Sequence, residues 1–285
     1  MAGNIEHTMA HVKDSYYFEV PRNLVEGGKL WIPQPFGELS NGPHPTPISG
    51  FCISKFMVLE VVVAVLLLLV FIPIARRIAT GERPQGRFWN FFELLLVFIR
   101  DEIARSAIGK KDGDRFVPIL WTLFFFILFC NLLGLLPWLG TATGAVGTSG
   151  ALAAIVVCVS IGAGSSKMGL VGFWKAQVPH IELPIALAVI LIPMLFVIEV
   201  LGLFIRHIML GMRLFANMFA GHIVLVVLMG FIASTAGTLA WFGVMPAAVF
   251  GCTAMMLLEI FVAFLQAYIF TFLSALWIGM AVHPH

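Results

Sequence analysis

Residues 210–221 read Leu-Gly-Met-Arg-Leu-Phe-Ala-Asn-Met-Phe-Ala-Gly and place one arginine, Arg213, in the middle of an apolar run. No Lys or Arg follows Arg213 in the chain, and Glu259 is the only acidic residue after it. An arginine at membrane depth costs about 2.5–3.5 kcal/mol on insertion scales. Its guanidinium also stays protonated at physiological pH. A fixed positive charge in this position therefore predicts a functional role.

The composition is that of a membrane protein. Of the 285 residues, 60% are hydrophobic and only 11% are charged, and the mean hydropathy is +0.99. These values exclude an ordinary soluble domain and predict an all-α polytopic membrane protein. The first residues are polar, so we expect no cleavable signal peptide. Since the cysteines and histidines lack metal-ligand spacing, we expect neither a metal site nor a cofactor.

The distribution of charge predicts the topology. Residues 1–55 are expected to form an extramembrane arm, largely irregular because prolines are dense in it, and residues 56–285 the membrane domain. The first span is predicted over residues 56–75. Residues 76–115 then carry more than half of the 17 Lys and Arg residues of the chain. By the positive-inside bias this loop is cytoplasmic and the N-terminus lies outside.

A helix that does not span is predicted within this loop. Residues 88–106 have an aromatic, leucine-rich first half followed by four charged side chains. This segment is too charged to cross a bilayer, so we expect it to lie in the inner membrane interface.

The remaining apolar segments predict the rest of the membrane domain. Spans are expected over residues 117–139 and 151–166, the second rich in small residues that suit close helix packing. The next segment either breaks into two spans at Arg206-His207 or continues as one long helix, and its lack of turn residues favours continuity. We expect helices over residues 180–232 and 239–282, both overlong for upright spans, to form a tilted hairpin.

Helical periodicity gathers polar residues on one face of the first long helix. At ~100° per residue, Glu199, Arg206 and Arg213 lie within about 40° of one another. Asn217 shares this face. A polar stripe in lipid is tolerated only against protein or water. Alternatively, Arg206 and His207 could form an interfacial turn.

Three further polar residues belong to the same apolar region. Glu259 and Gln266 share a face of the last helix, and His222 lies on the face opposite Arg213. Each also has a purely structural interpretation. Gln266, like Asn217, could only hold helices together, and His222 could be a packing histidine.

Several runs of this sequence resemble subunit a of F-type ATP synthase, the membrane stator subunit of the FO sector. They are Cys130-Asn-Leu-Leu-Gly-Leu-Leu-Pro137, Gly211-Met-Arg-Leu-Phe-Ala-Asn217, Ala220-Gly221 and Glu259-Ile-Phe-Val-Ala-Phe-Leu-Gln-Ala-Tyr-Ile-Phe270. The resemblance implies five crossings, whereas counting upright spans gives six. It also implies a multi-pass protein of the bacterial inner membrane, with the N-terminus outside and the C-terminus in the cytoplasm.

The resemblance also implies a function. In that family an arginine faces the essential carboxylate of each passing c subunit, and Arg213 matches it. The resemblance places Asn217 and Gln266 beside that arginine. It implies that two offset aqueous half-channels carry protons and are lined by Glu199, His222 and Glu259. The implied partners are the c-subunit ring, the b subunits of the peripheral stalk, the remaining subunits and the lipid membrane, with no nucleic acid.

The chain is not expected to be an enzyme by itself. It contains no Gly-x-x-x-x-Gly-Lys-Ser/Thr motif, so ATP chemistry is expected in other subunits. The coupling ion stays open between H⁺ and Na⁺, because the ion-binding carboxylate belongs to the ring. Two other functions stay open: a secondary transporter or channel, although no internal repeat supports it, and a structural scaffold.

One pair of positions departs from the family. Many bacterial members carry an acid where His222 stands and a histidine where Glu259 stands. This reciprocal exchange indicates that the two side chains meet across the helical hairpin. We therefore expect His222 and Glu259 to form a coupled titrating pair.

Overall fold

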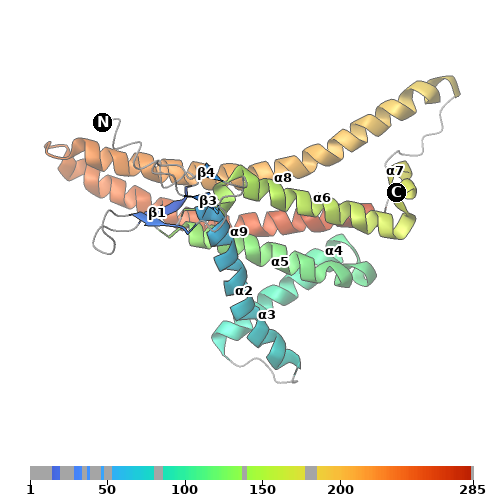
Figure 1. Cartoon of the computed structure of the whole chain (residues 1–285), viewed down its shortest axis with the longest axis horizontal. Helices are drawn as coiled ribbons and strands as arrows, with labels where there is room; N and C mark the ends of the chain where they lie inside the picture. Colours follow the sequence, from blue (N-terminus) through green and yellow to red (C-terminus); the bar gives the residue numbers. More distant parts are fainter. Residues whose placement is uncertain are drawn as a thin grey trace. The chain divides into compact units, whose positions relative to one another are not determined.

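The computed structural model of this protein describes residues 15–19, 29–33, 37–38, 46–47, 53–79, 86–136, 140–176 and 185–283. Within these ranges most residues are helical, and five helices are long and apolar enough to cross a membrane (Figure 1). The predicted all-α polytopic membrane fold is therefore confirmed.

The five long helices are α2 (Lys55–Ala79), α5 (Lys110–Gly134), α6 (Val146–Met168), α8 (Ile185–Thr235) and α9 (Trp241–Val282). Shorter helices lie between them: α3 (Arg87–Phe98), the π-helix η1 (Ile99–Ala104), α4 (Arg105–Ala107), the 3₁₀ helix η2 (Ala142–Gly144) and α7 (Leu170–Ala176).

The helix α8 is continuous over 51 residues. The alternative with a chain break at Arg206-His207 is therefore wrong. No turn-forming sequence interrupts this stretch, and the helix accommodates Pro193. A short turn with Gly237 at φ 84°, a conformation that glycine adopts without steric cost, leads into α9. The inclination of the two helices to a membrane stays a prediction.

The helix α6 begins earlier than the sequence predicts. It covers Val146–Met168, whereas residues 151–166 were expected because a Gly/Thr/Ser-rich stretch precedes them. In the structure Ser149 is buried at 1% exposure, and its carbonyl lies under Gly211 of α8. Tertiary packing thus overrides the weak helix propensity of these residues.

The N-terminal arm contains strands that the sequence analysis did not predict. The strand β1 (Tyr17–Glu19) pairs antiparallel with β2 (Lys29–Trp31), and β3 (Gly37–Glu38) pairs with β4 (Thr46–Pro47). Tyr17 faces Trp31 across the first pair, with ring centroids 5.3 Å apart. Cross-strand aromatic pairs of this kind stabilise short strands.

Between α2 and α5, residues 87–107 are helical and form α3, η1 and α4. Arg105 donates hydrogen bonds to Asp114 (Nε to Oδ1, 2.9 Å) and Asp101 (Nη1 to Oδ1, 2.8 Å). The hydrogen bond with Asp114 raises the pKa of the Arg105 guanidinium above its ordinary value. The location of this segment at the membrane interface stays a prediction.

The chain divides into two compact units. Unit 1 comprises residues 1–72, 126–148 and 214–266, and unit 2 comprises residues 73–125, 149–213 and 267–285. Each of the five long helices contributes residues to both units. The polar residues predicted from the sequence are therefore distributed over two units, with Arg213 the last α8 residue of unit 2.

Candidate functional site

In unit 2 the polar stripe of α8 begins with an ion pair. Arg206 Nη2 lies 2.6 Å from Glu199 Oε1, and Arg206 Nε donates a hydrogen bond to the carbonyl of Gly202 at 3.1 Å. The two side chains are 40% and 39% exposed. The pair therefore lies at the surface of α8 in unit 2.

His207, the next residue, packs inward. It is buried at 3% exposure, and its ring centroid lies 4.4 Å from that of Trp277 in α9. Its Nδ1 hydrogen bonds with the carbonyl of Leu203 at 2.7 Å. Its Nε2 has no hydrogen-bond partner within the described ranges. The interfacial-turn interpretation of Arg206 and His207 is therefore wrong.

Arg213 lies on the side of α8 that turns away from α6. Leu210 is only 1% exposed. A Cβ at Gly211 would lie 2.8 Å from the Ser149 carbonyl oxygen and 3.2 Å from Ala153 Cβ, so α6 packs closely there. Arg213 follows Gly211 by ~200° around the helix and is exposed. Among the described residues of unit 2, no side chain pairs with its guanidinium.

This close packing leads to a stability prediction. Gly211→Ala places a methyl group against the Ser149 carbonyl, and overpacking of this kind costs about 1–3 kcal/mol. We expect a lower apparent melting temperature of the detergent-solubilised protein than for Gly230→Ala. Gly230, also in α8, faces open space. Equal melting temperatures of the two variants would show that α6 does not pack here.

In unit 1 the structure brings His222 to Thr141. Nε2 of His222 and Oγ1 of Thr141 form a hydrogen bond. The hydroxyl belongs to the segment between α5 and η2 and is buried, with Thr141 3% exposed. The sequence alone gave no hydrogen-bond partner for His222, and Thr141 was not among the predicted site residues.

Glu259 of α9 approaches the same turn of α8. It is 7% exposed, and its Oε1 occupies the space that a Cβ at Gly221 would fill. Its Oε2 has no hydrogen-bond partner in the described part of the chain. Gly221 precedes His222, so the hairpin places Glu259 beside the turn that carries the histidine. Within the described ranges, no direct hydrogen bond joins Glu259 and His222.

Other polar contacts in unit 1 involve residues that sequence reasoning missed. Thr143 donates a hydrogen bond to Asn131 Oδ1 at 2.7 Å, and Thr148 donates one to Glu60 Oε1 at 2.6 Å. Asn131 Nδ2 is buried without a partner among the described residues. The available signal was a polar residue inside an apolar span, as with Asn131 in α5 and Glu60 in α2.

Asn217 and Gln266 lie in unit 1 and make no polar contacts with its described residues. Asn217 is half-buried and lies one helical turn after Arg213. Gln266 is 3% exposed, and its Nε2 is buried without a partner in the described ranges. Neither side chain has a hydrogen-bond partner among the described residues of unit 1. Hydrogen bonds between helices of unit 1 therefore do not explain why these two polar side chains lie in apolar segments.

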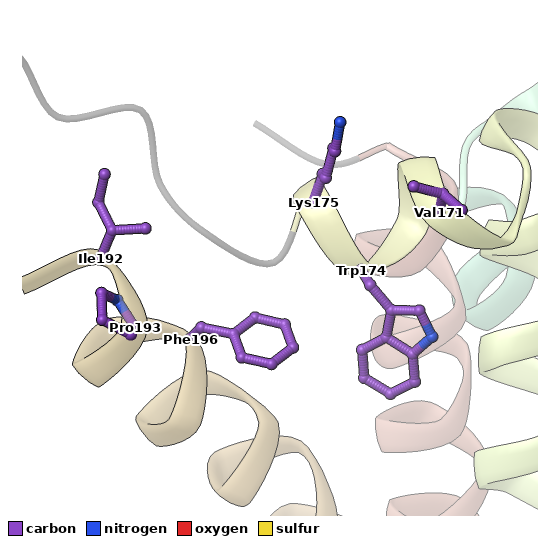
Figure 2. A pocket seen from close by; sticks show the side chains of 6 residues that line it. All are labelled: Val171, Trp174, Lys175, Ile192, Pro193 and Phe196. Carbon is purple, nitrogen blue, oxygen red and sulfur yellow. The ribbon is translucent and has the colours of Figure 1, made fainter. Parts of the chain in front are cut away.

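A shallow groove in unit 2 lies between α7 and the first turns of α8 (Figure 2). Its volume is about 430 Å³. Trp174 and Phe196 face each other across it, with ring centroids 6.4 Å apart. The lining residues are Val171, Trp174, Lys175, Ile192, Pro193 and Phe196. None of the polar residues predicted for proton transfer lines this groove.

The described residues form no metal site. They contain no group of three or more His, Cys, Asp or Glu side chains that could hold a metal ion. The polar groups described in the two units are carboxylates, imidazoles, guanidinium groups, hydroxyls and amides, of which the carboxylates and imidazoles can bind and release protons.

Comparison with known proteins gives one consistent result. The family described as "ATP synthase A chain" matches residues 57–279. The protein named ATP synthase subunit a of Myxococcus xanthus (strain DK1622) is 44% identical over 236 residues, covering 82% of this chain and 75% of the relative. That of Anaeromyxobacter dehalogenans (strain 2CP-C) is 40% identical over 283 residues, covering 96% and 70%. That of Chloroherpeton thalassium (strain ATCC 35110 / GB-78) is 39% identical over 242 residues, covering 82% and 68%.

Proposed function

This chain belongs to the ATP synthase A chain family, and from this membership we propose that it is the stator subunit that passes protons to and from a rotating c-subunit ring. The ring, the b subunits of the peripheral stalk and the remaining ATP synthase subunits are its proposed partners. Nucleotide chemistry is assigned to those other subunits. We place the N-terminus outside the bacterial inner membrane and the C-terminus in the cytoplasm.

The observation that carries the proposal is the exposure of Arg213. Its guanidinium is unpaired among the described residues of unit 2, on the face of α8 away from the α6 contact. A charge in lipid needs a partner. A carboxylate presented by a neighbouring c subunit supplies that partner.

The energy of such a contact suits a rotary device. At ~4 Å and an effective dielectric constant near 20, opposite unit charges attract by about 4 kcal/mol. This attraction favours the ionised carboxylate and so promotes release of its proton. It is still weak enough for the carboxylate to separate from Arg213 as the ring turns. The fixed positive charge also repels a proton that would cross directly.

Polar residues of each unit are assigned to one of the two half-channels. His222 and Glu259 are assigned to the half-channel in unit 1, and Glu199 is assigned to the half-channel in unit 2. Three buried polar atoms of unit 1 have no hydrogen-bond partner among the described residues, namely Asn131 Nδ2, Glu259 Oε2 and Gln266 Nε2. Buried polar atoms without protein partners are normally bound by water, which supports an aqueous path. Asn217 and Gln266 are assigned to the surroundings of Arg213.

Site-directed photocrosslinking tests which partner faces Arg213. Met209 and Ala220 share the helical face of Arg213, and both are exposed. A benzophenone amino acid at either position is expected to give adducts of this chain with the c subunit, detected by immunoblotting of the intact complex. The same label at Leu68 in α2, which is 57% exposed, serves as the control.

The crosslinks separate the proposed function from the alternatives. A transporter or a scaffold has no reason to present this face to a ring. Adducts with the c subunit as abundant from Leu68 as from Met209 and Ala220 would contradict the assignment of the Arg213 face.

A further inference from the structure

Thr141 makes an unusual use of its hydroxyl. Its backbone is extended (φ −109°, ψ 113°) and it occupies the N-cap position of η2, but its side chain makes no capping hydrogen bond. At the N-cap of an α-helix, a threonine hydroxyl ordinarily accepts a hydrogen bond from a backbone N–H of the first turn. Here it is hydrogen bonded to Nε2 of His222 instead. The Thr141 hydroxyl therefore does not cap η2 and instead contacts His222 of α8.

The position of Thr141 is fixed by the preceding helix. A Cβ at Gly134, in the last turn of α5, would lie 2.5 Å from Thr141 Cγ2 and 2.6 Å from Thr141 Oγ1. Only a glycine at this position leaves room for the threonine side chain. Thr141 is therefore held between Gly134 on one side and His222 on the other, all within unit 1.

We propose that Thr141 is a positioning residue for His222, holding Nε2 so that protons enter and leave the imidazole at Nδ1. This inference rests on the proposed function, in which His222 relays protons. Among the described residues of unit 1, no side chain hydrogen bonds with Nδ1. Glu259 lies against the adjacent Gly221 with Oε2 unpaired, so a carboxylate is present beside the same helical turn.

A hydroxyl is suited to this task because it both donates and accepts hydrogen bonds. It accepts from Nε2–H when the imidazole is cationic and when the neutral ring carries its proton on Nε2. It can donate to Nε2 when the proton is on Nδ1 alone. In the relay, Nδ1 of the Nε2–H tautomer takes a proton from a hydronium ion of the aqueous path, which gives the imidazolium cation and a neutral water, and Nδ1 then releases that proton to the next acceptor. The relayed proton never resides on Thr141, and the imidazole keeps its orientation.

The test compares two ways of breaking the same contact. Thr141→Val removes the hydroxyl and keeps the shape of the side chain. Gly134→Ala keeps the threonine, but its added methyl group would push the hydroxyl away from His222. Each variant is expected to lower the initial rate of ATP-driven vesicle acidification about tenfold, and Thr141→Ser is expected to retain the rate within about twofold. The double variant is expected to be no slower than Thr141→Val alone, since both changes remove one interaction.

A background without the imidazole separates positioning from general packing. In His222→Gln, Thr141→Val is expected to cause no further loss, because the hydroxyl has no histidine to hold. The control is Thr253→Val in α9, because Thr253 is exposed and its hydroxyl donates a hydrogen bond to the Val249 carbonyl of its own helix. Rates are normalised to the amount of assembled complex in the vesicles.

The inference is overturned if Thr141→Val pumps like the unmodified protein, if Thr141→Ser loses as much as Thr141→Val, or if Thr141→Val causes the same loss in the His222→Gln background. Arg213→Ala, measured alongside, distinguishes the two proposals. Normal pumping by Arg213→Ala would refute the proposed function itself. Loss of pumping in Arg213→Ala with normal pumping in Thr141→Val would refute only the role of Thr141.

Discussion

Arg213→Ala is expected to abolish ATP-driven proton pumping. The variant removes a positive charge that has no partner among the described residues of unit 2, whereas Arg206 on the same face of α8 is paired with Glu199. Losing an attraction of about 4 kcal/mol corresponds to a rate reduction of about 10³-fold, since about 1.4 kcal/mol is worth a factor of ten. Acidification of inverted vesicles, followed with a pH-sensitive dye after addition of ATP, measures the effect.

Arg213→Lys tests whether charge alone is sufficient. A lysine keeps the positive charge but has a compact ammonium in place of the planar guanidinium fork. We expect it to fail in pumping as well. Arg206→Ala is the matched control, because Arg206 lies on the same helix and is paired with Glu199 at the surface. A loss of pumping in Arg206→Ala as large as that in Arg213→Ala would contradict the assignment of Arg213 as the residue that faces the ring carboxylates.

Glu259→Gln is expected to reduce pumping about 10²-fold. Glutamine keeps the shape and polarity of the side chain but cannot bind and release a proton. Positioned acid–base groups contribute about 10²–10⁴-fold to proton-transfer steps. The same vesicle assay measures the loss. Pumping at the unmodified rate would show that Glu259 is a structural carboxylate held against Gly221.

Exchanging the two residues tests their proposed coupling. The single variants His222→Glu and Glu259→His each leave two like groups and are expected to lose pumping. The double variant restores one acid and one imidazole beside Gly221, and we expect it to recover a substantial part of the rate. Additive losses in the double variant would mean that the residues act independently.

The sequence was sufficient for those features that depend on local pattern. The uninterrupted apolar run around Arg206 favoured one long helix, and α8 is continuous because no residue in it demands a turn. The arginine and the only later carboxylate, Glu259, stand out for a related reason. A charged side chain within an apolar segment carries a free-energy cost in a membrane, so its presence can be recognised from the sequence alone.

Features that depend on contacts between distant residues were not predictable. Thr141 and His222 are 81 residues apart in the sequence, and no local pattern around Thr141 indicates a contact with α8. Gly221 showed no local sign that it makes room for Glu259. The early start of α6 depends on packing of Ser149 against Gly211, which outweighs the propensity of its glycines. The pairing of β1 with β2 likewise includes a cross-strand contact, between Tyr17 and Trp31.

Passive proton leak through Arg213→Ala is the most direct test of the claim that this residue separates two half-channels. The measurement uses vesicles that contain the intact complex without nucleotide, with a proton gradient imposed from outside. We predict that the unmodified complex holds the gradient and that Arg213→Ala dissipates it, because no fixed charge then blocks transfer between the channels. Vesicles with Arg213→Ala that stay as tight as those with the unmodified complex would contradict the account.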